Sequence, residues 1–469
     1  MRRTKIVATI GPASRSSEVL ERLILAGVNV VRLNFSHGAH DEHLAVIQTV
    51  REIADRLERS VAILQDLSGP KIRTGRLEGP ILLETGRQIR ITTDVTVAGT
   101  PERISTTYAP LPRDVVGGDT ILLDDGNLEL RVASVSGDEV TCDIVHGGRL
   151  KSSKGMNLPG VALSTPAITT KDRRDLEFGI RAGVDYVALS FVRKASDVTE
   201  CQELVRSFGG TAPVIAKIEK REAVDDLPQI LEVADGLMVA RGDLGVEMST
   251  EEVPILQKRM IEMANGAGKI VITATQMLES MIDSARPTRA EASDVANAIL
   301  DGTDAVMLSA ETASGNFPVQ AVETMARIAH YTERQSGALA PSRVAGGPHS
   351  MVARSLARVA STVAEELDCK LIVAFTQSGA TARLVSSYRP KTPIAAITHD
   401  LQAARRLALW WGVTPVPSTF ADTTDEMIVQ GQALLKTKGF VQSGDTILML
   451  AGQSHTAGAT NMLRVHTIT

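Results

Sequence analysis

The segment VIAKIE, residues 214–219, and a second apolar segment, GLMVARGD at residues 236–243, decide the fold of this chain. Both are apolar enough to be buried strands, and a segment of helical length separates them. Because strand side chains alternate between two faces, Lys217 and Glu219 are expected on one face. Buried charges are costly unless they are paired or bind a ligand. The pattern therefore predicts adjacent buried strands that carry a site for a divalent metal and a phosphorylated anion.

Strand-like and helix-like segments alternate on both sides of this pair. Three such units precede residue 70 and about five follow residue 156. Eight strand–helix units with crossover spacing imply a closed (β/α)8 barrel, the TIM-barrel fold of the α/β class. We assign residues 1–70 and 156–338 to this barrel, which is interrupted after its third strand.

The interruption differs in composition from the barrel segments. From about residue 72 to 155 the chain is rich in Thr, Val, Gly and Asp, with short strand-like runs and no helical period. This predicts an all-β domain over residues 71–155. A linker rich in Gly, Pro and Ser at 336–350 precedes a second strand–helix block. We expect an open α/β domain over residues 339–469.

Bulk composition excludes several classes of protein. The 469 residues suit two or three domains, and the net charge of −5 gives no reason to propose nucleic acid or a membrane as a partner. Three scattered cysteines, outside any CxxC spacing, argue against a disulfide framework or a zinc site. Neither a signal peptide nor an apolar run of about 18 residues is evident, so we expect a cytoplasmic protein.

Polar residues end nearly every predicted barrel strand. In such a barrel the active site lies at the carboxyl ends of the strands. In chain order these ends supply Thr9, Ile10 and Gly11; Arg32, Asn34 and Ser36; Asp66; Lys217 and Glu219; Arg241 and Asp243; Thr273 and Thr275; Ser309 and Glu311. Alternation places each pair on one face. A complete ring of this kind indicates a catalytic site.

The charges in this ring constrain the chemistry. Glu219 and Asp243 supply oxygen ligands for a hard cation such as Mg²⁺, and Arg32, Lys217 and Arg73 supply cations for phosphate. The sequence has no Ser/His/Asp arrangement, reactive cysteine or GxxxxGK[ST] loop. Phosphoryl transfer by positioning and charge neutralisation is therefore favoured.

At these residues the chain closely resembles the pyruvate kinase family. The motifs that carry the resemblance, in order from residue 4 to residue 313, are TKIVATIGPAS, VVRLNFSHG, GPKIRTG, KGMNLPG, AKIEKREAV, VARGDLGVE, ATQMLESM and MLSAETA. AKIE together with ARGDLG is close to diagnostic, whereas GPKIRTG alone is weak. The resemblance implies transfer of the phosphoryl group of phosphoenolpyruvate to ADP, giving pyruvate and ATP in glycolysis.

The resemblance also implies roles for individual residues. Catalysis would rest on Lys217, which neutralises the moving phosphoryl group, Arg32, which contacts phosphate, and Thr275 near the methylene carbon. Glu219 and Asp243 would hold Mg²⁺ or Mn²⁺. The substrate would be bound by Arg32, Lys217, Gly242, Asp243 and Thr275. The nucleotide would face Asn34, Phe35, Ser36, His37, Arg73 and Lys154, and the β domain would close over the site as a lid.

One departure concerns the monovalent cation. Asn34, Ser36, Asp66 and Leu67 lie at the positions of the family's cation ligands. Potassium-requiring members have Glu where this chain has Lys71, and Thr where it has Leu67. Because a fixed ammonium on the lid hinge can replace a bound cation, we expect activity without added K⁺.

The C-terminal block contains a candidate regulatory site. The segment TQSGAT follows an apolar strand and opens a helix, where hydroxyls and backbone N–H groups suit an anion. The resemblance implies a phosphorylated effector bound by Thr376, Gln377, Ser378, Gly379, Ala380 and Thr381. Ordinary helix capping by Ser378 or Thr381 is the alternative. Residues 452–461, including His455, could close the pocket, and the resemblance suggests a homotetramer.

Two other functions remain open from the sequence. A Mg²⁺-dependent lyase or aldolase on the same barrel would use a Glu/Asp metal pair, but would not need the lid or Lys154. A non-catalytic metabolite sensor would use the C-terminal pocket, and it predicts loss of Lys217, Glu219 or Asp243, which are all present.

Overall fold

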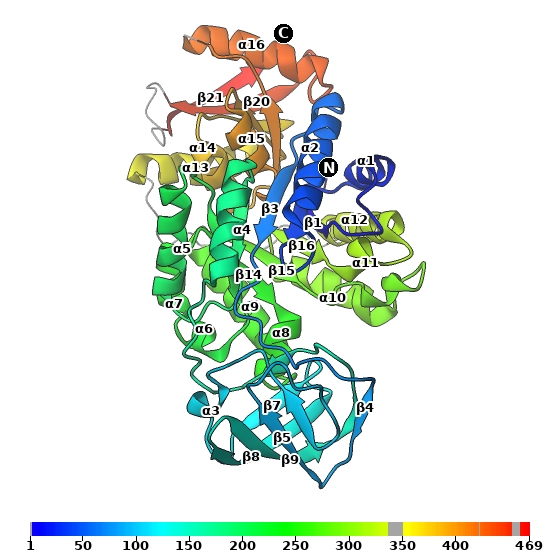
Figure 1. Cartoon of the computed structure of the whole chain (residues 1–469). Coiled ribbons are helices and arrows are strands. Elements are labelled where there is room, and N and C mark those ends of the chain that lie inside the picture. Colours follow the sequence, from blue (N-terminus) through cyan, green and yellow to red (C-terminus); the bar gives the residue numbers. More distant parts are fainter. Residues whose placement is uncertain (1, 336–349, 422, 453–459) are drawn as a thin grey trace.

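The computed structural model describes residues 2–335, 350–421, 423–452 and 460–469. The chain folds into a central barrel with a β-rich domain at one end and an α/β domain at the other (Figure 1). The two end domains contact opposite ends of the barrel, so the two ends of the barrel strands have different neighbours.

Eight parallel strands close the barrel, as the sequence predicts. They are β1 (Lys5–Thr9), β2 (Val30–Asn34), β3 (Ala62–Asp66), β12 (Tyr186–Leu189), β13 (Val214–Ile218), β14 (Gly236–Ala240), β15 (Ile270–Ala274) and β16 (Ala305–Leu308). They pair in this order, and β16 pairs with β1. Nearly every residue in them is buried, as expected for parallel strands covered on both faces.

Helices surround the barrel. They are α1 (Ser17–Ala26), α2 (His40–Arg56), α4 (Thr170–Arg181), α5 (Ala195–Ser207), α6 (Arg221–Asp225), α7 (Leu227–Val233), α8 (Arg241–Glu247), α9 (Val253–Gly266), α10 (Arg289–Leu300), α11 (Ala310–Ala313), α12 (Pro318–Gln335) and the 3-10 turn η1 (Glu279–Ile282). The sequence predicts one helix over 221–234, which is wrong. Two helices form because Pro228 fits only the first turn of a helix, so α7 starts there.

The inserted domain leaves the barrel after β3 and returns before α4. Its strands are β4 (Ile81–Leu83), β5 (Gln88–Thr92), β6 (Arg103–Ser105), β7 (Thr120–Leu123), β8 (Leu128–Ser136), β9 (Glu139–His146), β10 (Gly148–Leu150) and β11 (Met156–Asn157). Six of them form one sheet in the order β11-β7-β8-β9-β5-β6, and β10 pairs with β4. The expectation of an all-β domain is wrong at one place, the four-residue helix α3 (Leu111–Asp114).

The C-terminal domain is an open sheet with helices, as predicted. Its elements are α13 (Met351–Glu366), β17 (Leu371–Phe375), α14 (Ala380–Ser387), β18 (Ile394–Thr398), α15 (Leu401–Leu407), β19 (Val413–Pro417), α16 (Thr424–Thr437), β20 (Thr446–Gly452) and β21 (Thr460–Thr467). The strand order is β19-β18-β17-β20-β21, with β21 antiparallel to β20 and the other pairs parallel.

The C-terminal domain packs on the amino ends of the barrel strands. Nζ of Lys5, at the start of β1, donates to the carbonyl of Val413 (2.6 Å). Just before β16, Asp304 forms a buried ion pair with Arg389 (2.8 Å). Barrel-interior side chains and C-terminal side chains such as Trp410 belong to one apolar cluster. The carboxyl ends of the strands are therefore left for the inserted domain to cover.

Candidate active site

Lys217 and Glu219 share one side of β13, as strand alternation predicts. Nζ of Lys217 lies 2.8 Å from Oε1 of Glu219 and 3.2 Å from Oδ1 of Asp66, which comes from β3. It also donates to Oγ of Ser190 (2.7 Å), which follows β12. Three neighbouring strands therefore hold this ammonium.

Arg32 joins the same cluster from β2. Its Nε lies 2.6 Å from Oδ2 of Asp66, and its Nη1 donates to Oγ1 of Thr9 (2.9 Å). Burial acts to raise the pKa of Asp66, but Arg32 and Lys217 outweigh burial and lower it. Asp66 is therefore an ionised carboxylate whose two oxygens face two cations.

The pKa shifts of Lys217 and Glu219 show how charge is balanced. Burial acts to lower the pKa of Lys217, but Asp66 and Glu219 outweigh burial and raise it. The pKa of Glu219 is raised, by burial first and by the charge of Asp243 next, despite the neighbouring Lys217. Lys217 is therefore a permanent cation, and a further positive charge beside Glu219 would stabilise the ionised form of that carboxylate.

Asp243 does not lie on a strand, so the prediction that Arg241 and Asp243 share one strand face is wrong. β14 ends at Ala240, and Arg241 to Glu247 form helix α8. Within the described residues, the carboxylate of Asp243 has no hydrogen-bond or ion-pair partner. Arg241 turns away, and its Nη1 lies 2.7 Å from Asp294 on α10. Arg241 is therefore not available to a phosphate.

Thr275 lies just beyond β15 in a left-handed conformation, with φ of 67°. Its Oγ1 accepts from the N–H of Gly242 (2.8 Å) and donates to the carbonyl of Ala274 (2.7 Å). Nη2 of Arg241 donates to the carbonyl of Thr275 (2.6 Å). Left-handed backbone at a non-glycine residue is costly and persists only where its surroundings hold it.

Two other predicted strand-end pairs have structural partners instead. Thr273 stays on β15 and pairs with Oγ1 of Thr303 (3.0 Å). Glu311 lies in α11 and accepts from the N–H groups of Ser309 and Leu278. Burial raises the pKa of Glu311. The prediction that both residues of each pair face the site from one side of a strand is wrong. β15 ends at Ala274, before Thr275, and β16 ends at Leu308, before Glu311.

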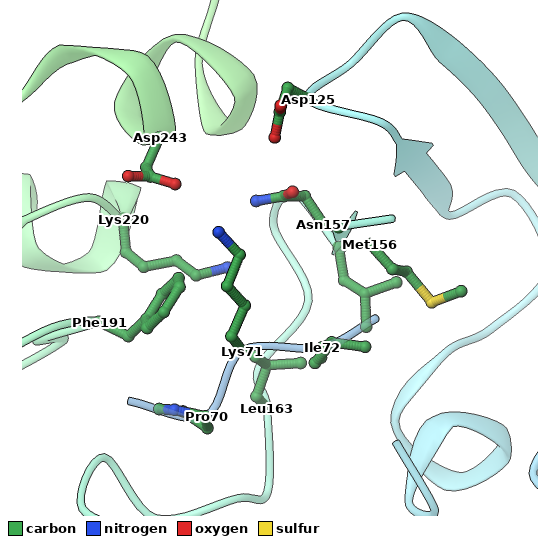
Figure 2. Close-up of a pocket in the computed structure, with 12 residues that line it drawn as sticks. Pro70, Lys71, Ile72, Asp125, Met156, Asn157, Leu163, Phe191, Lys220 and Asp243 are labelled. Atoms are coloured by element: carbon green, nitrogen blue, oxygen red, sulfur yellow. The ribbon is translucent and has the colours of Figure 1, made fainter. Parts of the chain in front are cut away.

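A pocket lies between the barrel and the inserted domain. Figure 2 shows the amino groups of Lys71 and Lys220 reaching into the space between Asp243 and Asn157. Lys220 is buried and lies 2.6 Å from Oε1 of Glu247. Asn157 donates to that same oxygen (3.2 Å), so the inserted domain contacts the far end of helix α8.

A second, larger cavity of about 560 Å³ opens beside Arg32. Asn34 and His37 line it, together with Thr9 and Ser309 from neighbouring strands. The pKa of His37 is lowered, by burial first and then by surrounding cations, which are Arg73, Lys71, Arg32 and Lys171. Positive charge therefore converges at this edge of the cavity.

Arg73 and Lys154 lie side by side on the two chain segments that connect the inserted domain to the barrel. Nη1 of Arg73 donates to the carbonyl of Ser153 (3.0 Å). Nζ of Lys154 lies 2.7 Å from Asp124, in the turn at residues 124–126, where all three residues have positive φ. Lys154 therefore has a carboxylate partner within its own domain.

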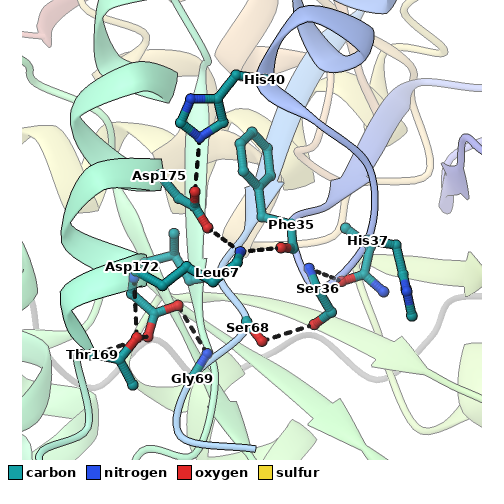
Figure 3. A network of polar contacts seen from close by, with 12 residues as sticks. Phe35, Ser36, His37, His40, Leu67, Ser68, Gly69, Thr169, Asp172 and Asp175 are labelled. Atoms are coloured by element: carbon teal, nitrogen blue, oxygen red, sulfur yellow. Dashed lines mark hydrogen bonds and ion pairs between the residues drawn. The ribbon is translucent and has the colours of Figure 1, made fainter.

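The expected cation ligands lie at the adjacent ends of β2 and β3. Asn34 pairs in register with Asp66, and Oδ1 of Asn34 accepts from the N–H of Ser36 (3.0 Å). Oγ of Ser36 donates to Ser68 (3.2 Å), as Figure 3 shows. The Asp66 carboxylate, however, faces Arg32 and Lys217.

The expected effector segment follows β17. Gly379 adopts φ of 85°, and Gln377 and Ser378 are exposed. No side chain in the described residues caps α14, so the capping alternative for Ser378 or Thr381 is wrong. Oγ1 of Thr381 instead lies 2.7 Å from Oγ1 of Thr460. Most of the loop 452–461, with His455, lies outside the described residues.

The sequence analysis missed several residues of the site. Ser190 and the N–H of Phe191, which donates to Oε2 of Glu219 (2.7 Å), come from the fourth barrel strand, for which no end residue was named. The polar Ser190 at the end of an apolar run was an available signal. Glu247 had no comparable signal, because only the placement of α8 beside the end of β13 brings it to Lys220.

Within the described residues, no three or more His, Cys, Asp or Glu side chains converge as a self-sufficient metal site. None of the described helices combines the length and apolar character that a membrane crossing requires.

Comparison with known proteins covers the whole chain. The family model for the pyruvate kinase barrel domain matches residues 1–322, and that for the pyruvate kinase alpha/beta domain matches residues 354–466. Curated pyruvate kinases of Staphylococcus aureus (strain USA300) and Staphylococcus epidermidis are 49% and 48% identical over 474 residues, spanning 100% of this chain and 81% of each relative.

A solved structure is similar over the same length. The crystal structure of a pyruvate kinase from Cryptosporidium parvum superposes with a TM-score of 0.91 at 39% identity, covering 100% of this chain and 96% of that one. None of these relatives supports the alternative of a lyase or aldolase.

Proposed function

The chain belongs to the pyruvate kinase family, and on that premise we propose how its residues transfer a phosphoryl group from phosphoenolpyruvate to ADP. One observation carries the proposal. Lys217 is held between Asp66 and Glu219 beside Asp243, a carboxylate without a partner in the described residues. A fixed cation next to a free carboxylate suits a phosphorylated substrate and a divalent metal together.

Lys217 and Arg32 bind the phosphoryl group. An oxygen of the ADP β-phosphate attacks phosphorus, and the bond from phosphorus to the enol oxygen breaks. Negative charge on the transferring oxygens is met by ammonium and guanidinium groups that Asp66 has already oriented. Because these cations need not reorganise during the reaction, their stabilisation is available at the transition state.

Glu219 and Asp243 would hold the divalent cation that the family uses, Mg²⁺ or Mn²⁺. The two carboxylates fit it, because burial and then the charge of Asp243 raise the pKa of Glu219, and a bound cation would relieve that repulsion. Mg²⁺ commonly takes one or two protein carboxylates and completes its shell with water and substrate oxygens. When bound, the cation neutralises the substrate carboxylate and phosphate.

Gly242 and Thr275 contact the substrate carboxylate and the enol. The N–H of Gly242 and the hydroxyl of Thr275 are hydrogen-bonded to each other, so both already lie at one point of the site. Thr275 orients the enolpyruvate whose methylene carbon gains a proton to give pyruvate.

ADP occupies the cavity of about 560 Å³. Its phosphates lie toward the turn of Asn34, Phe35, Ser36 and His37, where burial and then the surrounding cations lower the pKa of His37. Arg73 and Lys154, on the two connections of the inserted domain, reach the phosphates when that domain closes as a lid. Lys154 exchanges Asp124 for phosphate in this step.

Potassium is not required. The Asp66 oxygens are taken by Arg32 and Lys217, and Lys71 brings an ammonium into the pocket beside Asp243. Asn34, Ser36, Asp66 and Leu67 would be the ligands if a monovalent cation bound at all.

The domain division supports regulation from a distance. We assign residues 1–70 and 156–338 to the catalytic barrel, 71–155 to the lid and 339–469 to a regulatory domain, with β11 (Met156–Asn157) extending the lid sheet two residues past that boundary. A phosphorylated effector would bind at 376–381, where Gln377 and Ser378 are exposed. A homotetramer is expected from the family.

A coupled assay with phosphoenolpyruvate, ADP and Mg²⁺ tests the function. Wild type should form pyruvate and ATP, and Lys217→Met should lose turnover. Absence of pyruvate from wild type, or unchanged turnover in Lys217→Met, would overturn the assignment.

A further inference from the structure

Helix α4 begins where the lid connection returns to the barrel, and its first two turns contact two separate parts of the site (Figure 3). Oδ1 of the buried Asp172 accepts from the N–H of Gly69 (3.0 Å), where the chain leaves for the lid. Nζ of Lys171 donates to the carbonyl of Phe35 (2.6 Å), in the turn after β2. One helix therefore holds both the lid hinge and this turn.

Asp175 fixes the direction in which Lys171 points. Its Oδ2 lies 2.5 Å from Nζ of Lys171, and its Oδ1 lies 2.8 Å from Nε2 of His40. The His40 ring in turn stacks on Phe178 with 4.2 Å between ring centroids. Asp175 is almost fully buried, so its carboxylate is a firm anchor, whereas the side chain of Lys171 is 56% exposed.

The turn that Lys171 contacts is also held by its own hydrogen bonds and by neighbouring segments. Oγ of Ser36 donates to Ser68 (3.2 Å), Nε2 of His43 lies 2.9 Å from the His37 carbonyl oxygen, and the Phe35 ring stacks on His43. The N–H of Ser36 donates to Oδ1 of Asn34 (3.0 Å), and the N–H of His37 donates to the Asn34 carbonyl (3.2 Å). The N–H of Phe35 is bonded to the Asp66 carbonyl (2.9 Å), which continues the β2–β3 pairing. The Phe35 carbonyl projects to the other side, toward Lys171.

We propose that Lys171, anchored by Asp175, is a positioning residue that holds the Phe35–His37 turn in the conformation that receives the phosphates of ADP. The proposal rests on the assignment of that turn to the nucleotide. Lys171 acts through the Phe35 backbone. Because Asp175 restrains the rotamers of Lys171, the turn is already ordered before ADP binds, and the turn loses little conformational entropy on binding. The phosphoenolpyruvate site, centred on Lys217, does not depend on this contact.

Lys171→Met removes the ammonium but keeps a long side chain. Since hydrogen bonds from charged donors are among the stronger ones, KM for ADP should rise by about tenfold. KM for phosphoenolpyruvate should stay unchanged. Calorimetric titration with ADP in the presence of Mg²⁺ should show the same loss of affinity without relying on turnover.

Two further variants separate positioning from simple charge. Arg174→Met removes a cation from an exposed site of the same helix, and it should leave both KM values unchanged. Asp175→Asn keeps Lys171 and removes a negative charge, so electrostatics alone would tighten ADP binding. Loss of the anchor should instead raise KM for ADP.

The outcomes are distinct. A selective loss of ADP affinity in Lys171→Met and Asp175→Asn, absent in Arg174→Met, supports the proposal. Equal changes in both KM values, no change in Lys171→Met, or tighter ADP binding in Asp175→Asn overturns it. If wild type forms no pyruvate, the proposed function fails, but the calorimetric titration still decides on Lys171. No ADP binding by wild type also overturns the proposal.

Discussion

Nζ of Lys217 lies 2.8 Å from Oε1 of Glu219, and both side chains leave β13 on the same side. The proposed phosphoryl-binding cation therefore contacts a proposed metal ligand. Asp66, at the end of β3 two strands away, lies 3.2 Å from the same ammonium. This arrangement links two functions that could be independent, because a change at Lys217 leaves the buried Glu219 without its cation and leaves Asp66 with Arg32 alone.

Lys217→Met should lower kcat by about a hundredfold to a thousandfold, the range for removal of one preorganised electrostatic group. Affinity for Mn²⁺, followed by electron paramagnetic resonance, should change far less, because Glu219 and Asp243 remain. Lys370→Met, an exposed site in the C-terminal domain, is the control. A variant that loses metal binding and turnover in parallel would contradict separate roles.

Asp243→Asn should raise the Mg²⁺ concentration needed for half-maximal activity by about tenfold or more, since one of two carboxylate ligands is lost. Asp125→Asn is the matched control, because Asp125 lines the same pocket from the lid without a proposed metal role. Equal metal requirements for the two variants would argue against Asp243 as a ligand.

Arg241→Met should impair protonation of the enol through Thr275. Arg241 donates to the Thr275 carbonyl (2.6 Å), so its loss should release the left-handed backbone there. We expect the exchange of the C3 protons of pyruvate in D₂O, followed by NMR, to slow by about tenfold or more, as for loss of an oriented acid–base group. Arg259→Met, on helix α9, serves as an exposed control. A rate of proton exchange in Arg241→Met equal to that of wild type would contradict a role for Arg241 in positioning Thr275.

Lys71 should make the enzyme independent of potassium. In buffers with tetramethylammonium as the sole monovalent cation, wild type should keep its activity, whereas Lys71→Met should lose activity and regain it in part with K⁺. The physical reason is that an ammonium already lies in the pocket beside Asp243. A K⁺ requirement in wild type would refute this prediction.

Lys5 should make stability depend on pH. Burial first and Arg2 next lower its pKa to about 7, from 10.5. Between pH 7 and pH 10.5 the unfolded chain then binds more protons than the folded one, so wild-type stability gains about 1 kcal/mol per pH unit from this residue as pH rises. Lys5→Met lacks that gain. Its melting temperature relative to wild type should therefore fall between pH 7.5 and 9.5, and a constant difference would contradict the low pKa.

Much of the fold could be predicted from local pattern. Apolar runs such as VIAKIE alternate with helical segments, and eight such units leave few arrangements other than a closed barrel. The errors lie where one residue changes the local backbone. Pro228 divides a predicted helix into α6 and α7, and β14 ends at Ala240, so alternation could not place Asp243.

The candidate site was predictable only in part. Lys217, Glu219 and Asp66 could be found because each ends a buried strand. Lys171 and Asp175 could not, because they lie on a charged helix whose sequence does not show that Asp175 is buried or that Lys171 points toward the barrel. The contacts of Lys171 with Phe35 and of Asp175 with His40 each join residues more than a hundred positions apart.

The sequence by itself determined the order of strands and helices and the identity of the residues at the ends of the barrel strands. Periodicity and residue type are local properties of the chain, and they carry that information. The tertiary structure alone decided that Arg241 pairs with Asp294, that Glu247 meets Lys220, and that Lys171 reaches the Phe35 carbonyl. Such contacts depend on how closing the barrel brings distant segments together, and on which buried charges must then find partners.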